Sequence, residues 1–99
     1  MIDFARIAGF DWDKGNSRKN EKHGVTQAEA EQIFSDGRIL FAEDIGHSEA
    51  EARYQALGAS PAGRHLHVTF TLRHDGTSIR VISARDMNRK ERARYEGQT

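Results

Sequence analysis

The residues of this chain that are best suited to chemistry are arginines near its C-terminal end. Arg80 and Arg85 lie in and directly after an apolar run at residues 78–84, and Arg64 directly precedes a second run that begins at His65. An arginine binds two phosphate oxygens at once through its planar fork and keeps its charge at any working pH. Arg64, Arg80 and Arg85 could therefore converge on one phosphate group.

Arg80 is unusual because it lies inside an apolar segment. Burial of an unpaired guanidinium is unfavourable, so we expect this side chain either to form a structural ion pair or to point into a functional site. Four further cations follow near the C-terminus, namely Arg89, Lys90, Arg92 and Arg94. Such a run is most often a solvated helix face, and it is also what a nucleic-acid surface requires.

Charge is distributed unevenly along the chain, although its total is zero. Residues 1–61 carry seven Lys and Arg against eleven Asp and Glu, whereas residues 62–99 carry eight against four, so the two parts stand at −4 and +4. A basic C-terminal part can meet polyanions. The asymmetry therefore indicates a nucleic acid or an acidic protein as the partner.

The sequence carries no pattern for metal or cofactor chemistry. It has no Cys, its five His lack metal-ligand spacing, and it has no Gly-rich phosphate loop, so we expect neither a metal nor a cofactor. His65 and His67 fall on the polar side of a predicted strand, where surface histidines outnumber catalytic ones. The start is unlike a signal peptide and no apolar run could span a bilayer, so we expect no membrane contact and a cytoplasmic location.

Two helices are predicted in the N-terminal third. Residues 13–23 contain no apolar side chain, and Asp13 can cap this segment while Gly24 can end it in the left-handed conformation. If helical, the segment should be exposed nearly all round. The second helix begins at a capping box formed by Thr26 and Glu29, and its apolar face is expected to pack on the sheet.

The remainder of the chain predicts strands and a final helix. The strands are expected at residues 39–42, 53–60, 65–73 and 78–84, with a polar loop at 44–51 that carries His47. Apolar and polar residues alternate over 65–73, which predicts one buried and one polar face. Asp75-Gly76 favours a hairpin turn, and Asn88 with Glu91 makes an asparagine version of the capping box.

These elements predict a single α+β domain over residues 1–99. We expect an antiparallel sheet of about four strands, with two N-terminal helices on one face and a basic C-terminal helix. The other face of the sheet, which is polar and basic, should remain available to a partner.

Several short stretches occur in a particular order and spacing. They are FDWD at 10–13, KN at 19–20, KHGV at 22–25, HS at 47–48, RYQALG at 53–58, GR at 63–64, FTLR at 70–73, IRVISAR at 79–85, RKER at 89–92 and YE at 95–96. Together they resemble the BrnT family, the toxins of BrnT/BrnA type II toxin-antitoxin systems. The resemblance spans residues 10–96, and it rests on the order of the stretches rather than on any one of them.

The resemblance implies a RelE-like ribonuclease fold and a toxin that inhibits translation by cleaving RNA. It also implies a BrnA-like ribbon-helix-helix antitoxin as the partner, with operator DNA bound only through the antitoxin complex. Metal-independent RNA cleavage uses the ribose 2′-hydroxyl as the nucleophile. It needs a base for that hydroxyl, cations for the phosphorane and an acid for the 5′-oxygen.

The resemblance and the residue types together define the candidate site. The catalytic candidates are Arg64, Arg80, Arg85 and Tyr95, and the RNA-binding candidates are Lys19, Lys22, His23, His67, Arg89 and Arg92. The arginines would stabilise charge, and Tyr95 or a histidine would transfer protons. The alternative is a non-catalytic binding module that acts only in an antitoxin and operator-DNA complex. The presence of all four catalytic candidates favours the ribonuclease.

Overall fold

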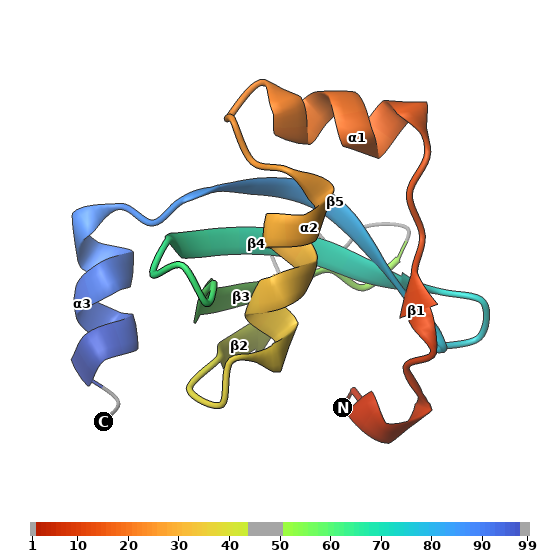
Figure 1. Cartoon of the computed structure of the whole chain (residues 1–99). Helices are drawn as coiled ribbons and strands as arrows, with labels where there is room; N and C mark the ends of the chain where they lie inside the picture. Colours follow the sequence, from red (N-terminus) through yellow and green to blue (C-terminus); the bar gives the residue numbers. More distant parts are fainter. Residues whose placement is uncertain (1, 44–50, 98–99) are drawn as a thin grey trace.

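A five-stranded mixed sheet organises the chain (Figure 1). The computed structural model describes residues 2–43 and 51–97, with the backbone alone at residues 19–21 and 43. The strands are β1 (Gly9–Phe10), β2 (Leu40–Glu43), β3 (Tyr54–Ala59), β4 (His65–Arg73) and β5 (Ser78–Asp86), in the spatial order β1-β5-β4-β3-β2. β1 runs parallel to β5, and the other neighbouring strands are antiparallel.

The predicted α+β class is confirmed, but the expected sheet of about four antiparallel strands is wrong in one detail. β1 is a fifth strand, and it pairs in parallel with the start of β5. It has only two residues, which is too short to show the two-residue period by which a strand is recognised in sequence. The predicted loop with His47 lies outside the described residues except for residue 51.

Three α-helices and two 3₁₀ turns complete the described fold. They are the 3₁₀ turn η1 (Phe4–Arg6), α1 (Lys14–Glu21), α2 (Gln27–Gln32), the 3₁₀ turn η2 (Ile33–Ser35) and α3 (Arg89–Gly97). The predicted caps are present: Asp13 Oδ1 accepts from the backbone of Gly15, and Thr26 forms the capping box with Glu29. Gly24 has a φ of 68°, the left-handed conformation expected of a residue that ends a helix.

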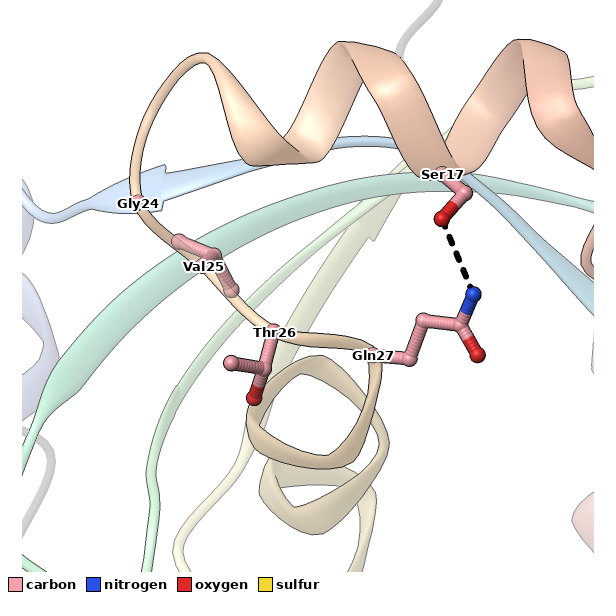
Figure 2. A pocket seen from close by; sticks show the side chains of 5 residues that line it. All are labelled: Ser17, Gly24, Val25, Thr26 and Gln27. Atoms are coloured by element: carbon pink, nitrogen blue, oxygen red, sulfur yellow. Dashed lines mark hydrogen bonds between the residues drawn. The ribbon is translucent and has the colours of Figure 1, made fainter.

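α1 packs along β5 through polar rather than apolar contacts (Figure 1). The expectation that α1 would be exposed nearly all round is wrong at Asn16, which is buried. Its side-chain amide donates to the carbonyls of Asp11 (2.9 Å) and Val81 (3.0 Å), so it satisfies an edge carbonyl of β5. A further hydrogen bond, from Gln27 Nε2 to Ser17 Oγ, joins α2 to α1 across the hollow drawn in Figure 2.

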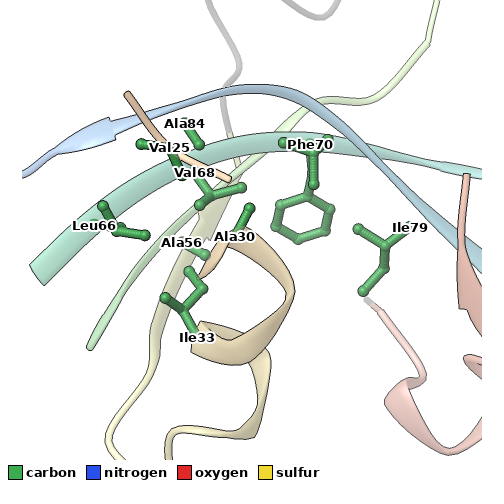
Figure 3. Packing of buried hydrophobic residues seen from close by; sticks show 10 residues of the cluster. Val25, Ala30, Ile33, Ala56, Leu66, Val68, Phe70, Ile79 and Ala84 are labelled. Carbon is green, nitrogen blue, oxygen red and sulfur yellow. The ribbon is translucent and has the colours of Figure 1, made fainter. Parts of the chain in front are cut away.

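The hydrophobic core lies between α2 and one face of the sheet (Figure 3). Ala30 and Ile33 contribute to it from the helical side. The sheet contributes Ala56, Leu66, Val68, Phe70, Ile79, Val81 and Ala84, and Val25 adds to it from the connection between α1 and α2. We call this side of the sheet the core face. The side that carries His67, Thr69 and Thr71 is called the opposite face.

A β-bulge in β5 controls which of its residues reach each face. Ser83 pairs with Thr69 while Val81 pairs with Phe70, which leaves Ile82 as an extra residue. As a result Arg80 lies opposite Thr71 and Arg85 lies opposite His67. Both arginines therefore share the opposite face, although a regular two-residue period would place them on different faces.

The opposite face is not the freely accessible polar surface that the alternation in β4 predicts. His67 and Thr71 are both buried. α3 covers His67, because Glu91 lies 3.6 Å from its imidazole, and the Thr71 hydroxyl donates to the carbonyl of Ala52. Alternation predicted the direction of these side chains correctly, but it could not predict which later segment covers them.

β3 approaches η2 closely at Gly58, so we expect that a larger side chain at this position would destabilise the fold. A Cβ atom at this position would lie 3.0 Å from Ile33 Cβ and 3.2 Å from the Ile33 carbonyl oxygen. Gly58→Ala should therefore lower the free energy of unfolding by about 1–3 kcal/mol, the usual effect of overpacking a core. Urea unfolding would measure it. Gly9→Ala is the matched control, because a Cβ at Gly9 meets nothing within 4 Å. Equal stability of the two variants would contradict the close approach.

Candidate functional site

Arg64 is held by two acidic side chains and a carbonyl on the core side of the sheet. Its Nε donates to Asp86 (2.8 Å), and its Nη1 donates to Glu29 (3.1 Å) and to the carbonyl of Gly24 (2.8 Å). These contacts join the start of β4 to the end of β5 and to α2. The guanidinium is thus occupied by its own chain, and the two carboxylates outnumber its single charge.

Arg80 also has two carboxylate partners. Its Nη1 lies 3.1 Å from Asp13 and 3.7 Å from Asp11, and its side chain is 19% exposed. Since Asp13 also caps α1, the ion pair fixes the start of that helix to β5. Of the two expectations for Arg80, a structural ion pair or a functional site, the structure contains the ion pair.

Arg85 forms a bidentate ion pair with Glu91 of α3. Its Nη1 and Nη2 donate to the two carboxylate oxygens at 2.7 and 2.9 Å. One of these oxygens also accepts from the backbone N–H of Asn88, and the other lies 3.6 Å from His67 Nε2. Hydrogen bonding from Arg85, together with the contributions of Asn88 and His67, overcomes burial and lowers the pKa of Glu91 to about 2. We call Arg85, His67 and Glu91 the Arg85 cluster.

The structure does not bring the three arginines to one point. Arg64 contacts the core side, whereas Arg80 and Arg85 share the opposite face. Their partners Thr71 and His67 are four residues apart on β4, which corresponds to about 13 Å at the usual rise of a strand. In the structure each of these two guanidinium groups is turned to its own carboxylate partners, Asp13 for Arg80 and Glu91 for Arg85, so they do not meet at one point.

Charge balance distinguishes the Arg85 cluster from the other two arginine sites. Arg64 and Arg80 each face two carboxylates, so a phosphate at either site would meet net negative charge. Among the described residues, Glu91 is the carboxylate that pairs with Arg85, and His67 adds a group that is cationic when protonated. A phosphate therefore meets the least opposing negative charge at the Arg85 cluster.

Tyr95 anchors α3 instead of presenting its ring to solvent. It is 4% exposed, its hydroxyl donates to Asp36 Oδ2, and its ring packs edge-on against His65. Burial, and then the hydrogen bond to Asp36, raise the pKa of Tyr95 to about 12. Such a group is a poor base near neutral pH, and its ring cannot stack on a nucleobase while α3 is docked. These features disfavour the proton-transfer role that the sequence suggested for Tyr95.

The RNA-binding candidates fall into three groups. Lys22 and His23 are exposed after α1, and Arg89 and Arg92 are exposed on α3, where Arg92 pairs with Glu96. His67 is buried in the Arg85 cluster. Lys19 lies in α1, and its side chain is outside the described part.

Lys22 and His23 lie at the same end of the sheet as the Arg85 cluster. Gly24, which directly follows them, accepts a hydrogen bond from Arg64, and Arg64 also binds Asp86, the neighbour of Arg85. The exposed cations of α3 and of the α1–α2 connection therefore flank one end of β5.

Sequence reasoning missed two carboxylates that organise this end of the molecule. Glu91 was expected only as part of a helix cap, and its pairing with Arg85 was not expected. Asp36 accepts from Tyr95 and from the backbone of Ala59, and so joins α3 to β3. The capping box was the available signal for Glu91. No sequence signal marked Asp36 as a partner of Tyr95, since 59 positions separate them.

The hollow between α1 and α2 offers no charged group, and the described residues offer neither a metal site nor a membrane-spanning helix. The hollow in Figure 2 is lined by Ser17, Gly24, Val25, Thr26 and Gln27, and none of these five side chains is charged. Within residues 2–43 and 51–97, no three His, Asp or Glu side chains form a group that could hold a metal ion. No helix in these ranges is long and apolar enough to cross a membrane.

Comparison with known proteins identifies a family for most of the chain. A family model described as the ribonuclease toxin, BrnT, of a type II toxin-antitoxin system matches residues 12–91. The match extends from the segment before α1 into the first turn of α3, and so includes the Arg85 cluster. A search of curated proteins found no match to the chain.

We predict that the Tyr95 hydroxyl stabilises the docked position of α3. Tyr95→Phe should lower the free energy of unfolding by about 1.5–3 kcal/mol, because the variant loses a hydrogen bond to a carboxylate. The pKa of Tyr95 is raised to about 12 in the folded chain, from about 10 in the unfolded chain. The contribution should therefore be complete below pH 10 and decline as the pH rises to 12.

Denaturant unfolding between pH 8 and 12 would check this prediction. Tyr54→Phe removes the hydroxyl of the other tyrosine in the chain and is the matched control. The wild-type chain and the control should lose stability between pH 10 and 12 by more than Tyr95→Phe does. The same pH dependence in all three proteins would contradict the assignment.

Proposed function

This chain belongs to the BrnT family of ribonuclease toxins of type II toxin-antitoxin systems, and we propose that it cleaves RNA at the Arg85 cluster without a metal ion. In this proposal the ribose 2′-hydroxyl gives up its proton and attacks the adjacent phosphorus, the P–O5′ bond breaks, and O5′ takes up a proton, so that the products are a 2′,3′-cyclic phosphate and a free 5′-hydroxyl. The observation that carries the proposal is the bidentate anion site of Arg85, with a histidine beside it and the fewest opposing carboxylates of the three arginine sites.

Arg85 and His67 each have a role in this reaction that matches their chemistry. Arg85 stabilises the negative charge that develops on the nonbridging oxygens of the phosphorane, as a preorganised cation does in phosphoryl transfer. His67 transfers a proton, because an imidazole can both accept and donate one near neutral pH. Tyr95 holds α3 in its docked position and takes no part in the chemistry, and Arg64 and Arg80 hold the framework around β5.

Exposed cations around the cluster are proposed to bind the RNA backbone. Arg89 and Arg92 on α3, together with Lys22 and His23, flank the end of β5 where Arg85 lies. We include Lys19 because it lies in the last turn of α1, three positions before Lys22. Phosphate contacts of this type fix the position of the substrate and make binding sensitive to salt.

Membership of the family makes an antitoxin the partner of this chain. We propose that this antitoxin is a BrnA-like ribbon-helix-helix protein and that operator DNA is bound through the complex. A RelE-like relationship of the fold belongs to the same proposal and is supported by the α+β sheet with α3 packed on it. Inhibition of translation by cleavage of cytoplasmic RNA would be the result in the cell.

We predict that the purified chain cleaves RNA into products that end in a 2′,3′-cyclic phosphate or a 3′-phosphate. The 2′-hydroxyl is the nucleophile, so RNA with 2′-O-methyl groups should resist cleavage, and EDTA should not abolish it. End analysis of the products by mass spectrometry would test this. Activity that disappears with EDTA and returns with Mg²⁺ would refute the mechanism. Absence of cleavage would favour the non-catalytic binding module.

We predict that Arg85→Gln lowers the rate of cleavage by about two to three powers of ten, because one preorganised charge-stabilising group is lost. Arg73→Gln is the matched control: Arg73 is another ion-paired arginine of the sheet, it pairs with Glu51, and it lies at the far end of β4. The control should retain most of its activity. Circular dichroism must show both variants folded. Equal activity of folded Arg85→Gln and the control would remove Arg85 from the mechanism.

A further inference from the structure

The Glu91 carboxylate occupies a site whose donors suit a phosphate. Two guanidinium N–H groups of Arg85 and the backbone N–H of Asn88 donate to it, and the imidazole of His67 lies 3.6 Å away. A planar fork that binds both oxygens of a carboxylate binds two nonbridging oxygens of a phosphodiester in the same way. The Asn88 N–H lies at the start of α3, where helices favour anions.

Glu91 therefore stands where the RNA phosphate must bind in the proposed reaction. The Arg85 side chain is 38% exposed, so solvent reaches the guanidinium, but both of its terminal nitrogens already bind Glu91. His67 is 8% exposed beneath the same carboxylate. A phosphate can take these donors only if Glu91 leaves them.

We propose that Glu91 is an internal competitor of the substrate phosphate, so that docked α3 keeps the Arg85 cluster closed and a phosphodiester opens it by replacing the carboxylate. This inference rests on the proposed function for its substrate, but the exchange of anions at Arg85 is a binding property that is measurable without cleavage. Glu91 is thus a regulatory group of the site and not a catalytic residue.

The docking of α3 is suited to such an exchange. In this helix, which lies wholly within the described residues, Tyr95 is the buried side chain. Most other side chains of α3 are exposed, and the exposed cations are Arg89, Lys90, Arg92 and Arg94. Few apolar contacts hold the helix, so its displacement requires little loss of buried surface. The released helix would carry its cations to the polyanion that displaced it.

Acid does not provide an alternative way to open the cluster near neutral pH. The groups that face Glu91 are Arg85 from β5, His67 from β4 and the Asn88 N–H, and the pairing with Arg85 keeps its pKa at about 2. The Glu91 carboxylate is therefore ionised at every pH near neutrality. Protonation of Glu91 is therefore not the way in which the cluster opens, which is consistent with exchange for a competing anion.

Inorganic phosphate is the probe that tests the exchange in the complete chain. We expect Glu91→Gln to bind phosphate about tenfold more tightly than the wild-type chain, because one competing charge is removed. The amide oxygen of Gln can still accept from Asn88, which preserves the helix cap. Glu96→Gln is the matched control, since it removes a carboxylate from the same helix that pairs with Arg92. Its phosphate affinity should stay within about twofold of the wild type.

NMR titration would measure these phosphate affinities, and a double-mutant cycle would show whether the effect of Glu91→Gln depends on Arg85. In an Arg85→Gln background, Glu91→Gln should have no effect on phosphate binding, because the site of competition is absent. Equal affinity of Glu91→Gln and wild type, or weaker binding by the variant, would overturn the inference and make Glu91 a positioning residue for Arg85. Such a residue would also lower RNA cleavage when changed to Gln, whereas a competitor should raise it.

A measurement on the wild-type chain tests the exchange even if one of the variants folds poorly. Saturating phosphate should shift the carboxyl ¹³C resonance of Glu91, because its partner Arg85 is taken by phosphate. Phosphate that binds at Arg85 without moving this resonance would exclude the exchange. Tighter phosphate binding by Glu91→Gln without RNA cleavage by any variant would leave the exchange standing and remove the proposed function. RNA cleavage by the wild-type chain, with no increase in the phosphate affinity of Glu91→Gln, would support the proposed function and remove the exchange.

Discussion

The extra residue in β5 is the constraint on which the candidate site depends. Ile82 has no partner in β4, so the strand changes phase between Val81 and Ser83. Ile79, Val81 and Ala84 can therefore all face the core, while Arg85 reaches the opposite face beside His67. Without the bulge Arg85 would point toward α2 and its pairing with Glu91 would be lost. One irregular residue thus determines both the packing of β5 and the assembly of the Arg85 cluster.

Two of the three helices in the described fold, α1 and α3, are held to the sheet mainly by polar contacts. Only 36% of the residues are apolar, and α2 with the core face of the sheet uses most of the buried ones. α1 is held by Asn16 and the Arg80 ion pair, and α3 is held by Tyr95 and the Arg85 cluster. Polar contacts of this kind specify geometry well but contribute modest net stability, because each replaces a contact with water. This allows α3 to be both ordered and displaceable.

The cations of the chain are not equally available to a polyanion. Arg64 and Arg80 are the arginines that residue type and strand position favoured as phosphate ligands, yet each is matched by two carboxylates of its own chain. The acidic N-terminal part of the sequence supplies three of these four carboxylates, Asp11, Asp13 and Glu29. The −4 and +4 parts are therefore partly neutralised against one another in the fold. α3 alone carries four exposed cations, Arg89, Lys90, Arg92 and Arg94, of which Arg92 pairs with Glu96.

Local sequence determined the elements of this protein, because caps, turns and alternation act over a few residues. The Thr26 and Asn88 capping boxes, the left-handed Gly24 and the long strand of β4 could all be predicted in this way. The tertiary structure alone decided the parallel β1, the bulge at Ile82 and the partners of the arginines. Ion pairs such as Arg64 with Glu29 and Arg80 with Asp13 join residues 35 and 67 positions apart. Which carboxylate a given arginine meets is determined only in the packed chain. Any Asp or Glu could pair with any arginine as far as charge is concerned, and the order of residues along the chain does not tell which of them lie close together in space.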